Sequence, residues 1–193
     1  MKKVYVSFDD IQRQTQDIIR QLHQDQWRPD YVVGITRGGL TPAVLISQYL
    51  DTRMESLDVR LRDSYGPGPE SNLWMSEDAV GATPEEERDH YGRYDPAFRK
   101  NILIVDDIND SGETFNWIKQ DWQSTAFPDD PVWENIWGNT VRFAVLYENT
   151  ASNIEVPVSY YATEINKIDD PSWIVFPWEE WWRRWNPNEE VIA

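Results

Sequence analysis

Three carboxylates lie close together in the middle of this 193-residue chain, directly after a run of apolar residues. Asp106 and Asp107 follow the apolar run 102–105, and Asp110 comes three residues later. Adjacent carboxylates at the end of a strand accept hydrogen bonds from a sugar diol and help to place a divalent cation. The spacing therefore predicts a site that binds a diol and a metal ion.

A short loop after this acidic pair has the composition of a phosphate-binding loop. Residues 110–114 read Asp-Ser-Gly-Glu-Thr, and a helix is predicted to begin at about Glu113. Ser111 and Thr114 supply hydroxyl groups, Gly112 allows close approach of the backbone, and the first helical turn supplies unpaired N–H groups. A simple strand-to-helix turn needs only one capping residue, so this combination favours a phosphate site.

A second turn of unusual composition follows the apolar run 31–35. It consists of Thr36, Arg37, Gly38 and Gly39. Arg37 and the backbone N–H groups of this turn are suited to a pyrophosphate group. The alternative interpretation is an ordinary turn between a strand and a helix, with an exposed arginine.

Apolar runs alternate with helical periodicity along most of the chain. Ser7 and Asp10 have the spacing of a helix start, and apolar residues recur at helical spacing after them. Strands that alternate with helices predict an α/β fold, in which a central, mainly parallel sheet is flanked by helices and binds ligands at the carboxyl ends of its strands. The predicted strands are residues 1–6, 31–35, 57–61, 101–105, 141–147 and 160–163, and the predicted helices are residues 8–26, 40–50 and 113–122.

The whole chain, residues 1–193, is interpreted as one domain. Residues 63–97 are rich in glycine, proline and charge, which indicates a long, loop-rich hood that is partly mobile in the free protein. Residues 164–193 form a tryptophan-rich C-terminal segment and tail, and five of the eleven tryptophans lie between Trp173 and Trp185. Aromatic packing against the body of the protein is the simplest interpretation of most of them.

The composition excludes several classes of function. There is no cysteine, which excludes disulfides, cysteine-based zinc sites and a thiol nucleophile, and two histidines are too few for a histidine-rich metal site. No apolar run reaches the length of a membrane span, and the first residues do not have the pattern of a signal peptide, so a cytoplasmic protein is expected. The net charge of −16 disfavours nucleic acid and membrane partners, and an anion site would need N–H groups, a placed arginine and a divalent cation.

The segment 102–114 resembles the signature of type I phosphoribosyltransferases, which bind phosphoribosyl pyrophosphate (PRPP). That signature is four apolar residues, two acidic residues, two variable residues, and then Asp-Thr/Ser-Gly-x-Thr. The resemblance implies that Asp106 and Asp107 hold the ribose hydroxyls and lie near Mg²⁺, and that the loop 110–114 holds the 5-phosphate. It also implies the fold of that family, with Mg²⁺ as the cofactor and PRPP as a substrate.

Asp110 narrows the resemblance to enzymes that act on the 6-oxopurine bases hypoxanthine, guanine and xanthine. In those enzymes this position is an aspartate that takes or shares the proton on purine N7, whereas orotate and adenine enzymes usually have a non-acidic residue. PRPP synthetases also have an aspartate here, but they are much longer chains built of two such domains.

Two further segments resemble xanthine–guanine phosphoribosyltransferases. The turn at Thr36 and Arg37 is similar to their Ser-Arg-Gly-Gly loop, which contains a cis peptide bond, so a cis bond between these two residues is expected. Residues 171–179 resemble their Trp-Ile-x-x-Pro-Trp-Asp/Glu segment. This resemblance implies that Trp173 stacks on the purine and that Ile174 contacts it through the backbone. Burial in the core is the alternative for Trp173.

Ser64 and Tyr65 are similar to the Ser-Tyr of the family's flexible loop, which closes over PRPP. One family residue is missing, namely a lysine that follows the strand matching residues 141–147 and hydrogen-bonds the 6-oxo group. Asn149 lies nearest to its place and is predicted to donate a hydrogen bond to the base through its amide, with Lys167 as a less suitable substitute.

These observations predict a Mg²⁺-dependent transferase that joins a 6-oxopurine to the ribose phosphate of PRPP and releases pyrophosphate. Two alternatives stay open at this level: a phosphoribosyltransferase for another base, and a non-catalytic protein of the same fold that senses PRPP or a nucleotide. The expected partners are PRPP and a purine base, together with further copies of the chain in a homo-oligomer of two or more subunits.

Overall fold

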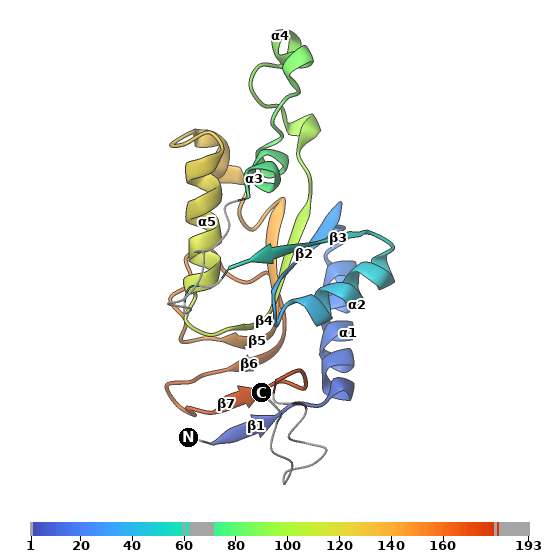
Figure 1. The fold of residues 1–193 in the computed structure, drawn as a ribbon, viewed down its shortest axis with the longest axis vertical. Helices are drawn as coiled ribbons and strands as arrows, with labels where there is room; N and C mark the ends of the chain where they lie inside the picture. The colour runs from blue at the N-terminus through green and yellow to red at the C-terminus, as the bar shows by residue number, and fades with distance from the viewer. Residues whose placement is uncertain (1, 60, 62–71, 180, 182–193) are drawn as a thin grey trace, which may run out of the picture.

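The computed structural model describes residues 2–59, 61, 72–179 and 181. Its centre is a five-stranded sheet with the strand order β3-β2-β4-β5-β6 (Figure 1). Every neighbouring pair in this sheet is parallel, which confirms the predicted α/β fold with a parallel sheet. The strands are β2 (Tyr31–Thr36), β3 (Arg53–Asp58), β4 (Ile102–Asn109), β5 (Val141–Asn149) and β6 (Tyr160–Ile165).

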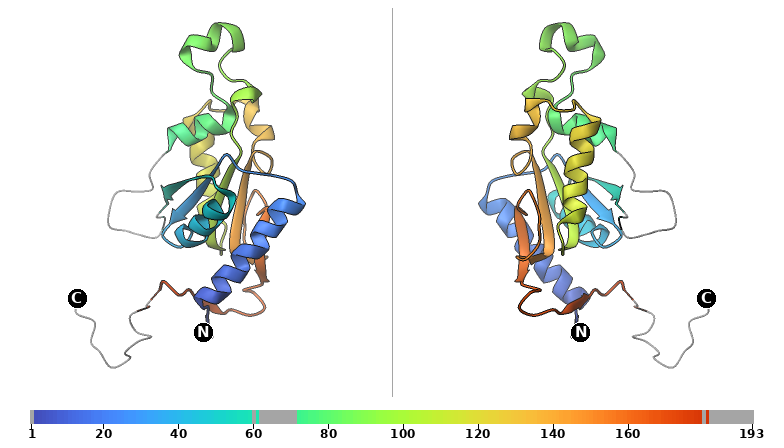
Figure 2. Two further views of the ribbon diagram at one scale, coloured as in Figure 1. Left: turned by 90° about the vertical axis from the view of Figure 1, so that its right-hand side faces the viewer. Right: turned by 90° about the vertical axis from the view of Figure 1, so that its left-hand side faces the viewer.

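Helices cover both faces of this sheet (Figures 1 and 2). The helices α1 and α2 lie on one face, and α3 and α5 lie on the other. Successive side chains of a strand point to opposite faces, so Val32 packs in the core beneath α1 and α2, and Val33 in the core beneath α5. No helix of the described part of the chain is both long and apolar enough to span a bilayer. The helices on these two faces are α1 (Phe8–Gln24), α2 (Leu40–Leu50), α3 (Leu73–Val80) and α5 (Glu113–Thr125). The short 3-10 helix η3 (Pro131–Asn135) precedes β5.

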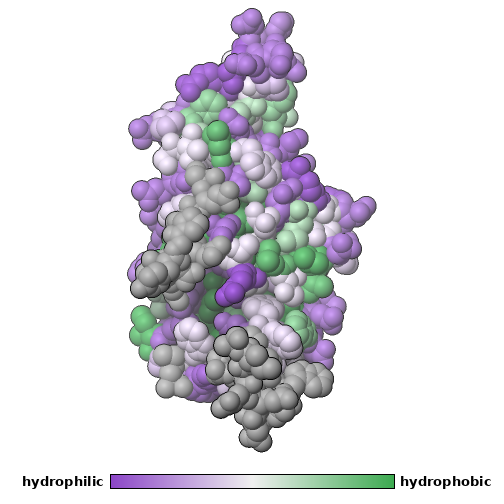
Figure 3. Space-filling view, in the orientation of Figure 1, coloured by the Kyte–Doolittle hydropathy of each residue, from purple (hydrophilic) through white to green (hydrophobic). Residues whose placement is uncertain are grey.

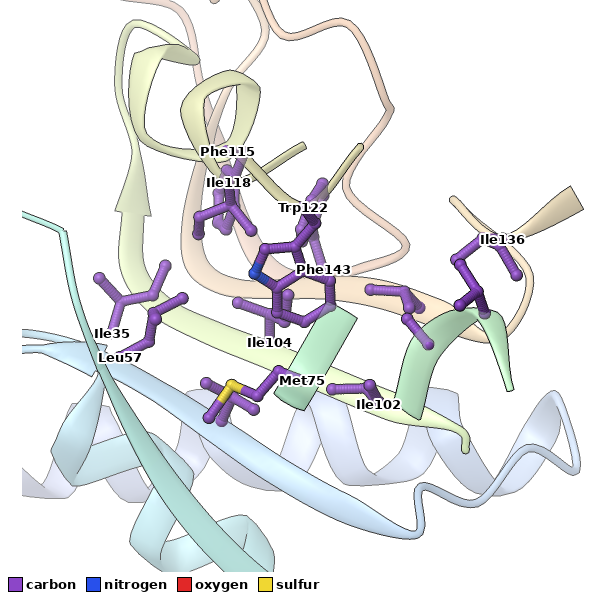
Figure 4. Packing of buried hydrophobic residues seen from close by; sticks show 14 of the residues in the cluster. Ile35, Leu57, Met75, Ile102, Ile104, Phe115, Ile118, Trp122, Ile136 and Phe143 are labelled. Carbon is purple, nitrogen blue, oxygen red and sulfur yellow. The ribbon is translucent and has the colours of Figure 1, made fainter. Parts of the chain in front are cut away.

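The core between the sheet and α5 is built from aromatic and branched side chains (Figure 4). The rings of Phe115 and Phe143 stack with their centroids 4.3 Å apart. Trp122 is fully buried in the same cluster, which also contains Met75 from α3. Burying a large apolar side chain contributes roughly 1.5–3 kcal/mol relative to leaving it exposed. This core therefore holds α5, and with it the loop from which the helix starts, firmly against the sheet.

The predicted start of the first helix is confirmed. Ser7 is the N-cap of α1, where its hydroxyl accepts a hydrogen bond from the Asp10 N–H and the Asp10 carboxylate accepts one from the Ser7 N–H. This reciprocal pair satisfies two of the N–H groups that the first turn of a helix leaves without partners.

A second, two-stranded sheet joins the start of the chain to its C-terminal part. In it, β1 (Lys3–Tyr5) runs parallel to β7 (Trp173–Val175). The N–H of Trp173 donates to the carbonyl oxygen of Lys2 at 2.8 Å, and the Lys2 ammonium lies 3.2 Å from the Asp170 carboxylate. The strand predicted at the start of the chain is therefore present, but it pairs with β7 and lies outside the central sheet (Figure 1).

The segment predicted as a loop-rich hood contains more regular structure than expected. Met75 and Ala79 are one helical turn apart in α3 and are buried in the core with α5, and Asn72 caps the helix by accepting a hydrogen bond from the Met75 N–H. The glycines and prolines around this helix dominate the composition and conceal its short apolar face. After α3 the chain forms a hydrophilic projection, at the top of Figures 1 and 3, which contains η1 (Glu85–Glu87), α4 (Arg88–Tyr91) and η2 (Pro96–Phe98).

The strands do not keep to their predicted limits. β4 continues to Asn109 and β5 continues to Asn149, because backbone pairing of Asn109 with Glu148 extends the ladder through polar positions. Pairing between neighbouring strands thus outweighs the intrinsic preference of these residues. β3 begins at Arg53, before the predicted start at Leu57. The acidic pair consequently lies within β4, at its carboxyl end, and not in a turn.

Candidate active site

The carboxyl ends of β2 and β4 open into a cavity of about 1120 Å³. The segments that line it are far apart in the sequence and include the turn after β2, the loop between β4 and α5, and the start of β7. A parallel α/β sheet binds its ligands at this edge. The predicted site residues that line the cavity are Thr36, Arg37, Gly38, Asp106, Asp107, Asp110, Ser111, Gly112, Glu113, Thr114, Trp173 and Ile174.

Two predicted site residues that the structure describes, Gly39 and Asn149, are not part of this lining. Ser64 and Tyr65 lie outside the described residues, so their place in a closing loop stays a prediction. Gly39 is buried directly behind the turn after β2, and Asn149 is buried beneath the loop between β4 and α5. These two residues shape the cavity from behind.

Asp106 and Asp107 place two carboxylates side by side on the cavity wall. Burial, and after it the charge of Asp107, raises the pKa of Asp106 well above its usual value of 3.8. Burial, and after it the charge of Glu179, raises the pKa of Asp107 to about 7. Among the described residues no lysine or arginine forms an ion pair with either carboxylate. The pair thus presents unbalanced negative charge, and a divalent cation is a suitable partner for it.

The turn after β2 fits tightly against the acidic pair, and its two glycines make that fit possible. A Cβ atom on Gly38 would overlap the carboxylate of Asp107, and a Cβ atom on Gly39 would overlap the backbone of β4. The peptide bond between Thr36 and Arg37 is cis, as predicted. The turn therefore brings its backbone and the Arg37 side chain to the cavity beside the two carboxylates.

The loop between β4 and α5 has the backbone shape of a phosphate-binding loop. Gly112 has a φ of +89°, which favours glycine, and a Cβ atom there would lie 2.6 Å from the backbone nitrogen of Ile154. The Asn153 N–H donates to the carbonyl oxygen of Ser111 at 3.0 Å and holds the loop in place. Because α5 begins at Glu113, the N–H groups of its first turn lie at the cavity, and that of Glu113 donates to the Ser111 hydroxyl at 3.4 Å.

Two side-chain contacts that support this loop were not predicted. Asn109 donates to the Glu148 carboxylate at 3.0 Å. Asn116 donates to the carbonyl oxygen of Asn153 at 2.9 Å and accepts a hydrogen bond from the Glu155 N–H at 2.8 Å. These partners are 37 to 39 positions apart in the sequence, so no local pattern could have revealed them.

A further part of the cavity wall is aromatic. Trp173 lines the cavity with 42% of its surface exposed, so burial in the core does not account for it. Its backbone is held by pairing with β1, and the neighbouring Ile174 is buried. Trp178 also lines the cavity and stacks on Phe176, with ring centroids 5.1 Å apart. The exposed indole of Trp173 is suited to stacking on a flat ring.

The expected role of Asn149 in base binding needs correction. Its amide nitrogen donates to the carbonyl oxygen of Asp110 at 2.8 Å, and its oxygen accepts hydrogen bonds from the N–H groups of Ala151 and Lys167 at 3.2 and 3.0 Å. Asn149 is only 5% exposed and does not line the cavity, because β5 continues through this position. Its side chain is therefore engaged with the protein and links the phosphate loop to the loop after β6.

Lys167 lines the cavity, although the sequence pattern did not favour it. Its ammonium lies 2.8 Å from a carboxylate oxygen of Asp110 and 5.9 Å from the centre of the Trp173 ring. A signal for it does exist, because Lys167 follows the carboxyl end of β6, which meets the same edge of the sheet as β4. Glu179 also lines the cavity, although the sequence pattern predicted no role for it. Burial raises the pKa of Asp107, and the negative charge of Glu179 raises it further.

A parallel sheet with an acidic pair, a phosphate loop and a glycine turn at one edge defines the phosphoribosyl transferase class of protein. The phosphoribosyl transferase domain family matches residues 7–184, which is most of the sequence. This chain therefore belongs to the phosphoribosyl transferase family.

Particular members of the family are similar to this chain over nearly its full length. The xanthine-guanine phosphoribosyltransferase of Cereibacter sphaeroides is 30% identical over 186 residues, which cover 92% of this chain and 87% of that one. The protein of the same name from Ruegeria is 28% identical over 184 residues, covering 92% and 86%. The solved structure of the purine phosphoribosyltransferase of Pyrococcus horikoshii shares the fold, with a TM-score of 0.59, 22% identity, and coverage of 100% of this chain and 99% of that chain.

Proposed function

We propose that this protein is a purine phosphoribosyltransferase, which forms a nucleoside monophosphate and pyrophosphate from a 6-oxopurine base and PRPP. The observation that carries the proposal is the meeting of three binding surfaces in one cavity, namely the acidic pair, the phosphate loop and the exposed ring of Trp173. A ribose, a phosphate and a flat base need these three surfaces. The names of the relatives, which are xanthine-guanine phosphoribosyltransferases, support the choice of base.

Each segment of the cavity receives one part of PRPP. The loop 110–114 binds the 5-phosphate through its hydroxyl groups and the N–H groups of the first turn of α5. The carboxylates of Asp106 and Asp107 accept hydrogen bonds from the ribose hydroxyls. The turn after β2 binds the pyrophosphate through Arg37 and backbone N–H groups, which supply the positive charge that an acidic protein otherwise lacks.

The base binds between Trp173 and Asp110. Trp173 stacks on its ring system, and the backbone of Ile174 contacts its edge. Nitrogen N9 of the base forms a bond to ribose C1 while the bond from C1 to the pyrophosphate oxygen breaks, and Asp110 accepts the proton that leaves N7. The carboxylates of the acidic pair stabilise the positive charge that develops at C1 during this step.

The acidic pair also supports a requirement for Mg²⁺. No group of three metal-binding side chains occurs among the residues that the structure describes. In phosphate-transferring sites Mg²⁺ is held by one or two carboxylates together with substrate phosphates, so the unbalanced carboxylates of Asp106 and Asp107 fit the ion. When bound, Mg²⁺ offsets the charge of the departing pyrophosphate.

Incubation with PRPP, Mg²⁺ and a panel of bases tests the proposed function, with the product mass as the measurement. We expect nucleoside monophosphates from hypoxanthine, guanine or xanthine, and slower reaction of adenine, uracil and orotate. If one of the latter bases reacts faster than every 6-oxopurine, the enzyme transfers to a different base. Binding of PRPP without any product would instead support a sensor of PRPP or of a nucleotide.

PRPP together with Mg²⁺ is expected to raise the melting temperature of the protein. A ligand present at about 100 times its Kd stabilises the folded state by about 2.7 kcal/mol, and each kcal/mol raises Tm by roughly 2–4 °C in a chain of this size. Excess chelator should remove most of this shift, because the net charge of −16 and the acidic pair repel the free polyanion. Thermal melts with PRPP, with Mg²⁺ alone and with both provide the comparison, and an equal shift in chelator would contradict a metal-bridged pyrophosphate.

Three further expectations belong to the same proposal. Residues 1–193 are predicted to act as one domain, copies of the chain are predicted to assemble into a homo-oligomer of two or more subunits, and the protein is predicted to work in the cytoplasm. Light scattering of the purified protein would measure the number of subunits.

A further inference from the structure

Lys167 and Asp110 form an ion pair that borders the cavity from two different loops. The Nζ atom of Lys167 lies 2.8 Å from Oδ1 of Asp110, and their side chains are 20% and 32% exposed. Both residues line the cavity, so a molecule bound there meets the pair directly. The same ammonium lies 5.9 Å from the centre of the Trp173 ring. A charged donor and a charged acceptor thus stand side by side next to an exposed aromatic ring.

Asn149 holds the two members of this pair from beneath. It donates to the carbonyl oxygen of Asp110 at 2.8 Å and accepts a hydrogen bond from the backbone N–H of Lys167 at 3.0 Å. Because Asn149 is buried and its amide nitrogen and oxygen are both engaged, it connects the two loops through a single side chain. The pair is therefore supported by a buried polar residue, unlike an ordinary ion pair between surface side chains.

One edge of a 6-oxopurine carries a hydrogen-bond acceptor and a donor that are complementary to the Lys167 ammonium and the Asp110 carboxylate. N7 and the 6-oxo oxygen are neighbours on that edge, so a base with a proton on N7 presents a donor beside an acceptor. We propose that Lys167 determines the specificity for the base by donating to the 6-oxo oxygen while Asp110 accepts the N7 proton, and that Asn149 positions both. This inference rests on the proposed function, and it places the donor on the loop after β6. Adenine is disfavoured because its 6-amino group offers no acceptor to the ammonium.

The test compares hypoxanthine with unsubstituted purine, which lacks the 6-oxo group and the N1 proton that accompanies it. The difference at N1 is the same for the wild type and the variant, so it cancels when the two proteins are compared. The measured quantity is the ratio of their kcat/KM values, determined for the wild type and for Lys167→Met, which keeps the length of the side chain and removes the charge. A hydrogen bond from a charged donor corresponds to a preference of about tenfold or more. We expect the ratio of kcat/KM for hypoxanthine to kcat/KM for purine to be about tenfold lower in Lys167→Met than in the wild type. The KM for PRPP should change by less than about twofold.

Lys119 offers a matched control. Its side chain is 25% exposed and its ammonium lies 2.6 Å from the Glu155 carboxylate, but it does not line the cavity. Lys119→Met therefore removes a partly buried, ion-paired lysine elsewhere and is expected to leave the base preference unchanged. If turnover of Lys167→Met is too slow to measure, calorimetric binding of inosine monophosphate and of its analogue without the 6-oxo group gives the same comparison.

The possible outcomes separate this inference from the proposed function. If the wild type transfers 6-oxopurines and Lys167→Met keeps the full preference for hypoxanthine, the role of Lys167 is overturned and the enzyme assignment stands. If the wild type neither reacts with any 6-oxopurine nor binds inosine monophosphate, both are overturned.

A second variant tests the positioning role of Asn149. Asn149→Ala removes the hydrogen bonds to Asp110 and Lys167, together with the one to Ala151, but leaves the charged groups of Lys167 and Asp110 in the chain. We expect the folded variant, verified by circular dichroism, to show a reduced preference for hypoxanthine over purine. A purely structural role would lower the melting temperature without changing this ratio, and that result would overturn the positioning role.

Discussion

Replacing Asp106 and Asp107 together with asparagine is expected to abolish turnover and, at the same time, to stabilise the empty protein at pH 8. The two carboxylates face the cavity and not the core, so asparagine fits in their place. Removing charged groups that act on the transition state costs at least about 100-fold in rate. The gain in stability has a separate cause, because the same two groups carry raised pKa values in the empty site.

The sign of the stability effect follows from the pKa of Asp107, which burial raises from 3.8 to about 7. Well below pH 3.8 the carboxyl group is protonated in the folded and the unfolded chain, and it does not favour either state. As the pH rises toward 7, the unfolded chain releases its proton while the folded protein retains it, so the free energy of unfolding falls. Asp106 acts in the same direction because its pKa is also raised.

Thermal melts of the double variant and the wild type between pH 4 and 8 measure this effect. We expect the variant to melt at least about 4 °C higher at pH 8, since each kcal/mol moves Tm by roughly 2–4 °C in a chain of this size, and the difference should become small toward pH 4. The double variant of Glu86→Gln with Asp89→Asn makes the same change in net charge on the exposed projection and serves as the control. Near-normal turnover, or a lower Tm at pH 8, would contradict the prediction.

Alanine at Gly39 is expected to destabilise the fold, whereas alanine at Gly38 is expected to lower turnover and leave the stability of the fold nearly unchanged. A Cβ atom at Gly39 would lie 2.8 Å from the Ile35 nitrogen and 2.9 Å from the Asp106 Cα, both of which are backbone atoms of neighbouring strands. Overpacking of this kind costs about 1–3 kcal/mol, so Gly39→Ala should lower Tm by several degrees and reduce activity. At Gly38 the three nearest atoms all belong to the carboxylate of Asp107, which can turn away.

Gly38→Ala should therefore keep the wild-type Tm to within about 2 °C, because no backbone has to move. Turnover should nevertheless fall by at least about tenfold, since the displaced carboxylate of Asp107 no longer faces the proposed binding site for PRPP and Mg²⁺. Melting curves and steady-state kinetics of the two variants are the measurements. If Gly38→Ala proves as unstable as Gly39→Ala, the turn after β2 packs against more than the Asp107 side chain.

The features that could be predicted from the sequence depend on residues close together along the chain. The acidic pair and the phosphate loop form one short segment, and the apolar runs that become β2 and β4 bring this segment and the Arg37 turn to the same edge of the sheet. Spacing and residue type were sufficient to predict that these segments meet, because a parallel sheet places the carboxyl ends of its strands side by side.

The features that were missed depend on contacts between distant residues. Asn149 is 39 positions from Asp110, and its local sequence does not reveal that its amide is engaged there. Lys167 was named only as a less suitable substitute for Asn149, because the sequence alone does not show that β6, the strand before Lys167, lies beside β5. The helix α3 was missed because its buried residues are few and lie among glycines and prolines. In each case tertiary packing, and not local preference, decides the structure.

The pairing of β1 with β7 joins a strand that is synthesised early to a strand that is synthesised late. Lys2 and its partner Asp170 are 168 positions apart. At roughly 5–20 residues per second, β1 leaves the ribosome on the order of ten seconds or more before β7 is made. The strands that carry the acidic pair and the phosphate loop emerge within this interval, whereas Trp173 has not yet been added. A nascent chain therefore contains the residues proposed to bind the ribose and the phosphate before it contains Trp173, and β1 can pair with β7 only after β7 has been made.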